Sequence, residues 1–482
     1  MIKLRLLFLS LIVLSGINQT IVAQDNGVHL SLKTSGLTSG GSDLPFWFTS
    51  NQQGIFEQSC KNYQLADFKI DKSFRIDAEK KWDYLYGGRL VYANGVSSYH
   101  QFNEWYAGIK YKSFYFKAGA FPEETVYNGL SSTNGDMRWS NNARPMPRIR
   151  LATNEYIPLP FGKNSNFWKD ITYKACYDEG FLNDNKLYVK HAHLHHKQLH
   201  FQKKLRNNYQ FTFGVDHYNM WGGTSPDQGP LPGFKSYLRY VLVLNGSKGF
   251  NKSDQEYVAG NSLGRYYFKL EHQQDQSKLT VYLDHPFEDR VTMQNFPDNL
   301  IGVVYESTQK KRISNLLFEF MITNDQNINR RKGLDDNGNV IQDHIENYFQ
   351  HGTYRSGFSY CDRMIASPFF SPMVIINGIN MGTGNNRVIL FHGGLEGYFS
   401  DRFKWKTLLS YSMNHGTFDR IYNRINPGFF EHWKNQFSAY GELNYQIPTK
   451  GWDFSCALAT DQGEVLDDQI GIQLSIRKTI SF

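Results

Sequence analysis

The chain has 482 residues, a formal net charge of +7 and a mean hydropathy of −0.52, yet 16% of its residues are aromatic. The mild positive charge is not the signature of a nucleic-acid-binding protein. After residue 23 no apolar run approaches 18 residues, which excludes a transmembrane helix. Abundant Tyr, Phe and Trp in a hydrophilic chain favour an outer-membrane barrel with aromatic girdles over a soluble enzyme.

Residues 1–23 have the form of a secretory signal. Lys3 and Arg5 precede the apolar run Leu6–Leu14, and Ala23-Gln24 offers a cleavage point. The apolar run is too short for a membrane span. We therefore expect a cleaved signal peptide at 1–23, an N-terminal segment that is partly strand at 24–66, and a β-barrel in the bacterial outer membrane at 67–482.

Alternation of apolar and polar residues is the dominant pattern in the rest of the chain. It predicts strands with one wet face, because a helix would repeat every three to four residues. No amphipathic helix of 12 or more residues is predicted. The apolar members of four such runs are Phe68, Ile70, Phe74 and Ile76; Tyr209, Phe211, Phe213 and Val215; Tyr266, Phe268 and Leu270; and Leu316, Phe318, Phe320 and Ile322.

The C-terminal third predicts the topology. Strand-like runs at 387–399, 403–413, 436–446, 451–459 and 469–482 are joined by connections that alternate between short and long. Outer-membrane barrels have short periplasmic turns and long extracellular loops. We therefore expect 400–402 and 447–450 in the periplasm, and 218–235, 324–348 and 414–435 outside the cell.

The last strand ends in Phe482 and places its apolar residues on one parity. We expect Ile470, Ile472, Leu474 and Ile476 to contact outer-membrane lipid, and Gln473, Ser475 and Arg477 to face the lumen. A terminal aromatic residue on an alternating strand has the form of the signal that the barrel assembly machinery binds. This machinery is therefore an expected partner.

The stretch 130–151 is the first candidate for a ligand-binding site. It combines Trp139, Asn141 and the arginines Arg144, Arg148 and Arg150. Arginine binds carboxylates, phosphates and hydroxyl pairs bidentately, and tryptophan covers the apolar face of a sugar ring. Counting hairpins places the stretch at the extracellular mouth or in the lumen. The alternative interpretation is a polar loop with solvated arginines.

Other candidate sites are weaker. Trp221, in a Gly-rich loop beside His217, could form a sugar platform or belong to an aromatic girdle. His191, His193 and His195 share one strand face but are spaced too far apart to converge on one metal ion, and Asp335–Asn339 departs from the spacing of a calcium loop. The four cysteines form no metal motif, and no G-x-S-x-G occurs. We expect no cofactor, no metal and no catalytic residues.

Several segments together resemble the Wzi family of capsule-assembly outer-membrane proteins. They are LPFWFTSNQQGIF (44–56), WYAGIKYKSFYFKAGAFPEE (105–124), LSSTNGDMRWSNNARPMPRIRL (130–151), HLHHK (193–197), DHYNMWGGTSPDQGPLP (216–232), ENYFQHGTYRSGFSY (346–360) and NNRVILFHGGLEG (385–397). The resemblance implies an all-β, 18-stranded transmembrane antiparallel barrel that acts as a lectin for capsular polysaccharide. One departure is that the N-terminus lacks the pattern of the helical bundle found in enterobacterial members.

Three classes of function remain open. A surface lectin that retains capsular or surface polysaccharide needs a plugged lumen, whereas a porin or uptake channel needs an open one. An outer-membrane hydrolase needs a preorganised nucleophile and base. The resemblance favours the lectin, with the channel as the alternative and the hydrolase third.

Overall fold

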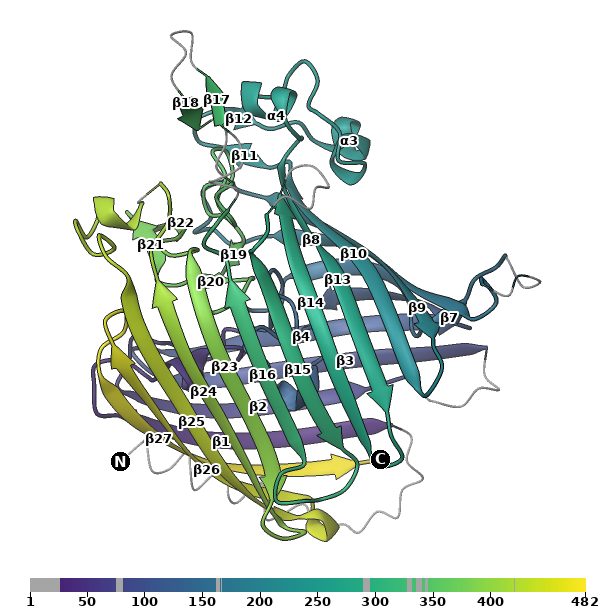
Figure 1. Cartoon of the computed structure of the whole chain (residues 1–482). Coiled ribbons are helices and arrows are strands. Elements are labelled where there is room, and N and C mark those ends of the chain that lie inside the picture. Colours follow the sequence, from purple (N-terminus) through teal and green to yellow (C-terminus); the bar gives the residue numbers. More distant parts are fainter. Residues whose placement is uncertain are drawn as a thin grey trace.

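The computed structural model of the chain describes residues 27–74, 81–161, 165, 167–288, 295–326, 332–334, 340–342, 346–419 and 421–482. Across these ranges, eighteen antiparallel strands form one closed barrel (Figure 1). The first strand pairs with the last, from His29↔Ser481 to Ser39↔Gly471, and this pairing closes the sheet. The predicted outer-membrane barrel is thus confirmed, and so is the strand number that the resemblance implied. The expected signal peptide lies outside the described residues.

The wall is built from successive hairpins. Its strands are β1 (Val28–Ser39), β2 (Asn62–Lys72), β3 (Trp82–Asn94), β4 (Ser98–Tyr111), β5 (Phe114–Ala120), β6 (Pro147–Thr153), β8 (Ile171–Leu182), β9 (Ala192–Lys204), β10 (Tyr209–Trp221), β13 (Asn261–Gln273), β14 (Ser277–Glu288), β15 (Asn299–Ser307), β16 (Asn315–Ile322), β23 (Val388–Tyr398), β24 (Phe403–Asn414), β25 (Lys434–Ile447), β26 (Trp452–Gly463) and β27 (Gln469–Ser481). The short β7 (Ile157–Pro158) also pairs with β8. The wall therefore includes part of the 24–66 segment.

The remaining elements are short and lie in the connections. The strands are β11 (Thr224–Ser225), β12 (Gly229–Pro230), β17 (Lys332–Leu334), β18 (Val340–Gln342), β19 (Ser359–Tyr360), β20 (Arg363–Met364), β21 (Met373–Ile376) and β22 (Ile379–Thr383). The α-helices are α2 (Phe46–Thr49), α3 (Tyr237–Val241) and α4 (Lys252–Glu256), and single 3-10 turns occur at Tyr127–Gly129, Phe234–Ser236, Tyr422–Arg424 and Pro448–Lys450. In the described part of the chain, no helix is both long enough and apolar enough to cross a membrane.

The two ends of the barrel differ in the length of their connections. At the end where β1 begins and β27 ends, turns such as 112–113, 205–208, 274–276, 399–402 and 448–451 are short. At the other end the connections 121–146, 222–260, 323–387 and 415–433 are long. Short turns face the periplasm in outer-membrane barrels, so the long loops face outward. The predicted alternation of short and long connections matches this arrangement.

Side chains on β27 follow the predicted register. Ile470 and Leu474 are 61% and 58% exposed on the outer surface, whereas Ser475 is buried. Gln473, Ser475 and Arg477 line an internal cavity. Alternation therefore separates a lipid-facing side from a lumen-facing side on this strand, because successive side chains of a strand point to opposite faces.

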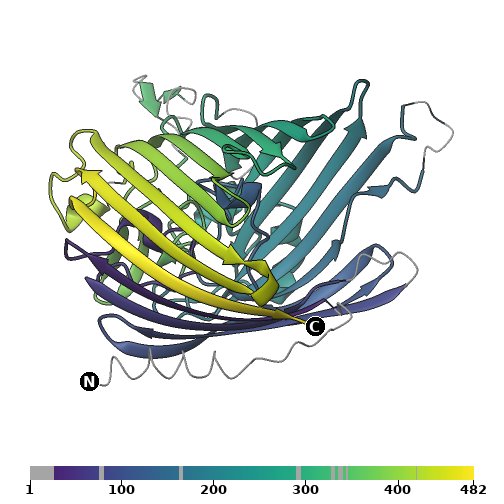
Figure 2. The same cartoon turned by 90° about the horizontal axis from the view of Figure 1, so that it is seen from below.

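Three connections fold into the barrel and fill its middle, as the view from below shows (Figure 2). We call the segments 40–61, 121–146 and 346–370 the plug. They are tied together by backbone hydrogen bonds, Gln53 N to Asn141 O at 2.7 Å and Ser140 N to Ile365 O at 2.8 Å. The rings of Phe46 and Phe369 pack 4.7 Å apart within a buried apolar cluster that also contains Trp139. The same cluster includes inward side chains of the wall such as Leu194 and Leu300, so the hydrophobic core lies between the plug and the barrel wall.

Candidate functional site

The arginine-rich stretch lies in the plug and continues into β6. Its most buried member is Arg138, which forms an ion pair with Asp284 on β14 and a second one with Asp136 at 3.2 Å. Asp136 also accepts a hydrogen bond from Tyr218 at 2.7 Å. Burial opposes ionisation of Asp136, but Arg265 and Arg138 outweigh it and lower the pKa of the carboxyl. These charges join the plug to the barrel wall.

Arg148 and Arg150 share the lumen-facing side of β6 and bind carboxylates. Arg150 binds Asp178 on β8 through two parallel hydrogen bonds, Nε–Oδ1 at 2.7 Å and Nη2–Oδ2 at 2.6 Å. Both guanidinium groups contact Glu123 Oε1, Arg148 at 2.6 Å and Arg150 at 2.8 Å. Burial raises the pKa of Glu123, but the two arginines outweigh it and lower that pKa to about 2. The guanidinium groups are therefore already paired with carboxylates.

The other residues predicted for this site take part in the same packing. Trp139 is buried, and its ring lies 4.9 Å from the Arg148 guanidinium carbon and 5.5 Å from the His196 ring. The Asn141 side chain exchanges hydrogen bonds with the Glu123 backbone, each at 3.1 Å. Arg144 donates to the carbonyl of Phe102 at 2.8 Å. Four of the six predicted residues, Trp139, Asn141, Arg148 and Arg150, are thus joined directly or through Glu123, whereas Arg144 binds β4 instead.

Trp221, the sixth predicted residue, lies apart from the others. It ends β10 on the outer side of the wall, where its ring stacks on His193 at 4.4 Å. Its indole Nε1 donates to Glu179 Oε2 at 3.2 Å. The structure therefore does not bring Trp221 to the arginine-rich stretch.

A chamber of about 1170 Å³ opens below the plug toward the short-turn end. Trp139 and Arg150 line it together with Arg265 and several lysines of β2, β4, β5 and β8, among them Lys69, Lys117 and Lys174. The chamber is slightly larger than the 300–1,000 Å³ of a typical small-molecule pocket. Two of the predicted residues, Trp139 and Arg150, therefore line an internal chamber of the barrel.

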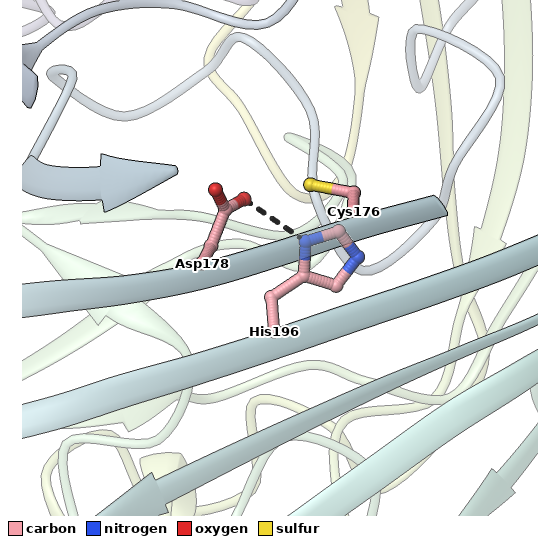
Figure 3. Close-up of side chains that lie close together, drawn as sticks. All are labelled: Cys176, Asp178 and His196. Carbon is pink, nitrogen blue, oxygen red and sulfur yellow. Dashed lines mark hydrogen bonds and ion pairs between the residues drawn. The ribbon is translucent and has the colours of Figure 1, made fainter. Parts of the chain in front are cut away.

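One group of three metal-ligating side chains occurs in the ranges that the structure describes. Cys176, Asp178 and His196 place one ligand atom each within 4.8 Å of one another (Figure 3). His196 Nδ1 lies 3.1 Å from Asp178 Oδ2. Arg150 already binds both oxygens of Asp178, so a cation would have to compete with a guanidinium. The group fits an ion-pair network better than a metal centre.

The histidines of β9 do not converge. His193 and His195 point outward, and His196 and His200 point into the lumen, because they differ in parity. His195 Nδ1 contacts Glu179 at 2.6 Å, whereas His200 Nε2 contacts Asp216 at 2.9 Å. His193 and His195 therefore share the outward face, as their spacing predicts, and whether they bind an ion stays a prediction. Residues 335–339, whose spacing departs from that of a calcium loop, lie outside the described residues.

A second pocket, of about 460 Å³, lies at the long-loop end and was not predicted from the sequence. We call it the outer pocket. Its lining comes from the loops 222–260, 323–387 and 415–433 and from the ends of β13 and β14. It consists of Ser253, Tyr257, Val258, Asn261, Ser262, Glu288, Glu346, Asn347, Gln350, His351, Gly352, Thr353, Arg355, Met381, Asp419, Ile421 and Arg424. The segment 346–360, which contributed to the family resemblance, was the one sequence signal that could have indicated this site.

Hydrogen bonds between loops hold the outer pocket in shape. Asn347 Nδ2 donates to Asp419 Oδ2 at 2.7 Å, and Asn251 Nδ2 donates to Thr353 Oγ1 at 3.0 Å. Burial lowers the pKa of His351 to about 4, so its imidazole is neutral at pH 7. Arg424 is exposed and forms no ion pair or hydrogen bond with any described residue. The pocket thus offers amides, hydroxyls, the carboxylates of Glu288, Glu346 and Asp419, and one available guanidinium.

Comparison with known proteins gives one family match, and it gives solved structures of similar fold but low sequence identity. The chain resembles Pseudomonas aeruginosa OccK5 (10% identity, TM-score 0.47, 94% of this chain and 98% of that one). It also resembles the outer membrane protein OprD of the same organism (9%, 0.47, 95% and 96%) and OccAB3 of Acinetobacter baumannii (10%, 0.44, 94% and 99%). None of the curated proteins matches the sequence.

The family match covers more than half of the chain. The profile described as "Capsule assembly protein Wzi" matches residues 49–373, a range that includes most of the plug, the arginine-rich stretch and most of the outer pocket. This match confirms the family resemblance of the sequence motifs. The chain is an outer-membrane β-barrel that belongs to the Wzi family of capsule assembly proteins.

Proposed function

We propose that the protein is a lectin that binds capsular polysaccharide in the outer pocket and retains it at the cell surface. The observation that carries this proposal is a pocket lined by amides, hydroxyls, carboxylates and one available guanidinium at the outward-facing end of a Wzi-family barrel. Sugar hydroxyls are both donors and acceptors, and such a lining supplies both partners. Arg424 would bind carboxylate or phosphate groups of an acidic polysaccharide.

The arginine-rich stretch has a different place in this proposal. Arg148 and Arg150 are paired with carboxylates, so their first role is to hold the plug against the wall. Trp139 and Arg150 nevertheless line the inner chamber. A second site for the polysaccharide in that chamber, formed by Trp139 and Arg150, is a separate proposal. The other residues predicted for this site, Arg144, Asn141 and Trp221, do not line the chamber.

The channel and the enzyme are less well supported. The plug places buried apolar residues across the middle of the barrel, which opposes a wide aqueous path. We therefore propose that the protein binds polysaccharide, and that it is neither a porin nor a hydrolase. Steady large single-channel conductance of the purified protein would instead support the channel. Export through a cleaved signal peptide and recognition by the barrel assembly machinery are parts of the same proposal.

Binding of the cell's own capsular polysaccharide by the purified protein tests the outer pocket. A charged hydrogen bond contributes about 1.5–3 kcal/mol, so Arg424→Ala should weaken binding of an acidic polysaccharide by roughly 10-fold or more. The matched control is Arg402→Ala, which removes the same charge from the short turn 399–402. Equal affinity of both variants and the unaltered protein would refute binding in the outer pocket.

A further inference from the structure

The upper ends of β8, β9 and β10 carry polar side chains on the outer surface of the barrel. Glu179, His195 and His217 have the parity of the lipid-facing residues Tyr177, Leu199 and Val215. Their neighbours of opposite parity, such as Asp178 and Asp216, point into the lumen. A carboxylate on the lipid-facing side of a barrel is destabilising, so these residues need a cover.

The cover is part of the connection between β10 and β13, residues 233–259, which we call the arm. Tyr237 Oη donates to Glu179 Oε1, and Asn219 Nδ2 donates to the backbone carbonyls of Tyr240 at 3.2 Å and Ala259 at 2.9 Å. Asn219 and His195 are fully buried although they have the outward parity. The arm therefore lies against the outer surface of the wall, and Figure 1 shows α3 at the upper rim beside β8 and β10.

The other face of the arm is apolar and exposed. Phe234, Leu238 and Leu242 are spaced four residues apart and are 81%, 68% and 59% exposed. Lys235 lies beside them and is also exposed. By contrast, the arm buries Tyr240 and Phe250 in a cluster with Trp221. The arm thus has one face for the wall and one apolar face that no described residue covers.

The position of the arm along the membrane normal indicates what covers its apolar face. On the wall, Leu199 and Val215 are paired neighbours in the apolar band, and Lys197 and His217 form the next outward-facing row. Lys197 Nζ donates to the carbonyl of Val241 in the arm. The arm therefore begins where the lipid-facing band ends, at the membrane surface. Apolar residues beside cations are typical of segments that lie in this interface.

We propose that the arm is a lipid anchor, in which Phe234, Leu238 and Leu242 insert into the outer leaflet of the outer membrane. Its exposed face continues the lipid-facing surface of β8–β10, and Lys235 stands where it meets anionic headgroups. The arm would also support the outer pocket at a fixed height above the membrane, because its last residues, including Tyr257, line that pocket.

Quenching by lipids with brominated acyl chains tests the anchor. A single cysteine replaces Leu238 in a protein whose Cys60, Cys176, Cys361 and Cys456 are serine, and it is labelled with an environment-sensitive fluorophore in proteoliposomes. Leu474, on the bare outer surface of β27, is the lipid-exposed control, and Ile425, 49% exposed in the loop 415–433, is the water-exposed control. We expect quenching at Leu238 close to that at Leu474. Quenching as weak as at Ile425 would overturn the proposal.

A second measurement keeps the native cysteines. Trypsin cleavage after Lys235 and Arg239 should be at least several-fold slower in proteoliposomes than in detergent, because lipid covers the arm. Leu238→Asp should abolish that protection, and Ile425→Asp should leave it unchanged. Equal cleavage rates of the unaltered protein in lipid and in detergent would also overturn the anchor and would assign the apolar face to another occupant.

Discussion

Two parts of the barrel wall use the same alternation in different ways. On β27, outward residues such as Leu474 face lipid, and inward residues such as Gln473 line a cavity of about 540 Å³. On β8–β10 both faces carry charges, because the plug covers the inside and the arm covers the outside. Asp178 binds Arg150 of β6, and Glu179 accepts from Tyr237 of the arm. We call these regions the bare wall and the covered wall.

The comparison shows that alternation tells which side of the wall a residue faces. It does not tell whether lipid, water or another part of the chain contacts the residue there. A charged residue that faces lipid at the middle of the membrane costs roughly 2–4 kcal/mol when it is Arg or Lys, and less near the interface. On the covered wall, loops from elsewhere replace lipid and water as neighbours. Substitutions on this wall should therefore act through the ion pairs and hydrogen bonds of the cover, whereas substitutions on the bare wall should act through lipid.

The largest loss of stability is expected on the lumen-facing side of the covered wall. Arg150→Ala leaves the fully buried Asp178 without its bidentate partner, and removing one member of a buried pair costs roughly 3–5 kcal/mol. The midpoint of guanidinium unfolding, followed by the folded band on unheated gels, should fall clearly. Arg402→Ala, on an exposed turn, should stay within roughly 0.5 kcal/mol. Equal midpoints for the two variants would show that the plug does not depend on this pair.

On the bare wall, the effect of a substitution should depend on whether the residue faces lipid or the lumen. Ile472→Arg places a guanidinium among lipid chains and should destabilise the barrel by roughly 2–4 kcal/mol, whereas Gln473→Arg points it into the cavity and should be tolerated. The folded fraction on unheated gels after refolding into vesicles measures the difference. Equal tolerance of both substitutions would contradict the register of β27.

Sequence reasoning predicted the wall because each strand carries its own signal. The alternating residues of β10 and β27, the short and long connections and the closing strand are all local patterns. The cover could not be predicted in this way. Nothing in the spacing of Glu179 or His195 says that residues 233–259 fold back over them, since this contact joins segments far apart in sequence.

The candidate site shows the same limit. The sequence placed Trp139, Asn141 and the three arginines in one stretch, but it could not show that Trp221 lies elsewhere or that Glu123 and Asp178 pair with Arg148 and Arg150. The outer pocket was missed because three loops each supply a few ordinary polar residues. Arg424 stands in a sequence context without a motif, and its availability is a property of the assembled loops.

A smaller effect on stability is expected on the outer side of the covered wall, where the arm binds Glu179. Tyr237→Phe removes the hydroxyl that donates to Glu179 but keeps the ring, and Glu179 retains His195 and Trp221 as partners. A hydrogen bond to a charged group contributes about 1.5–3 kcal/mol, and the remaining partners of Glu179 reduce the expected loss to about 1 kcal/mol. Tyr209→Phe is the matched control, because the structure gives the Tyr209 hydroxyl no hydrogen bond with a described residue and its ring stacks on His272. A midpoint shift as large for Tyr209→Phe would indicate a general effect of the outer surface.

The smallest effect concerns Glu123, the charge that fixes the plug to β6 beside the covered wall. Arg148 and Arg150 hold the pKa of Glu123 at about 2, below the ordinary value of 4.5. Because the folded-state pKa is the lower one, the unfolded chain binds the proton first. The stabilisation is complete above pH 4.5 and is lost as the pH falls toward 2. Between pH 7 and pH 4 the loss should be less than about 1 kcal/mol for this group. Glu123→Gln removes the titration, so its unfolding midpoint should depend less on pH in this range than that of the unaltered protein. An identical pH dependence in the two proteins would mean that other carboxylates govern the acid response, and that Glu123 does not control how the plug meets the wall.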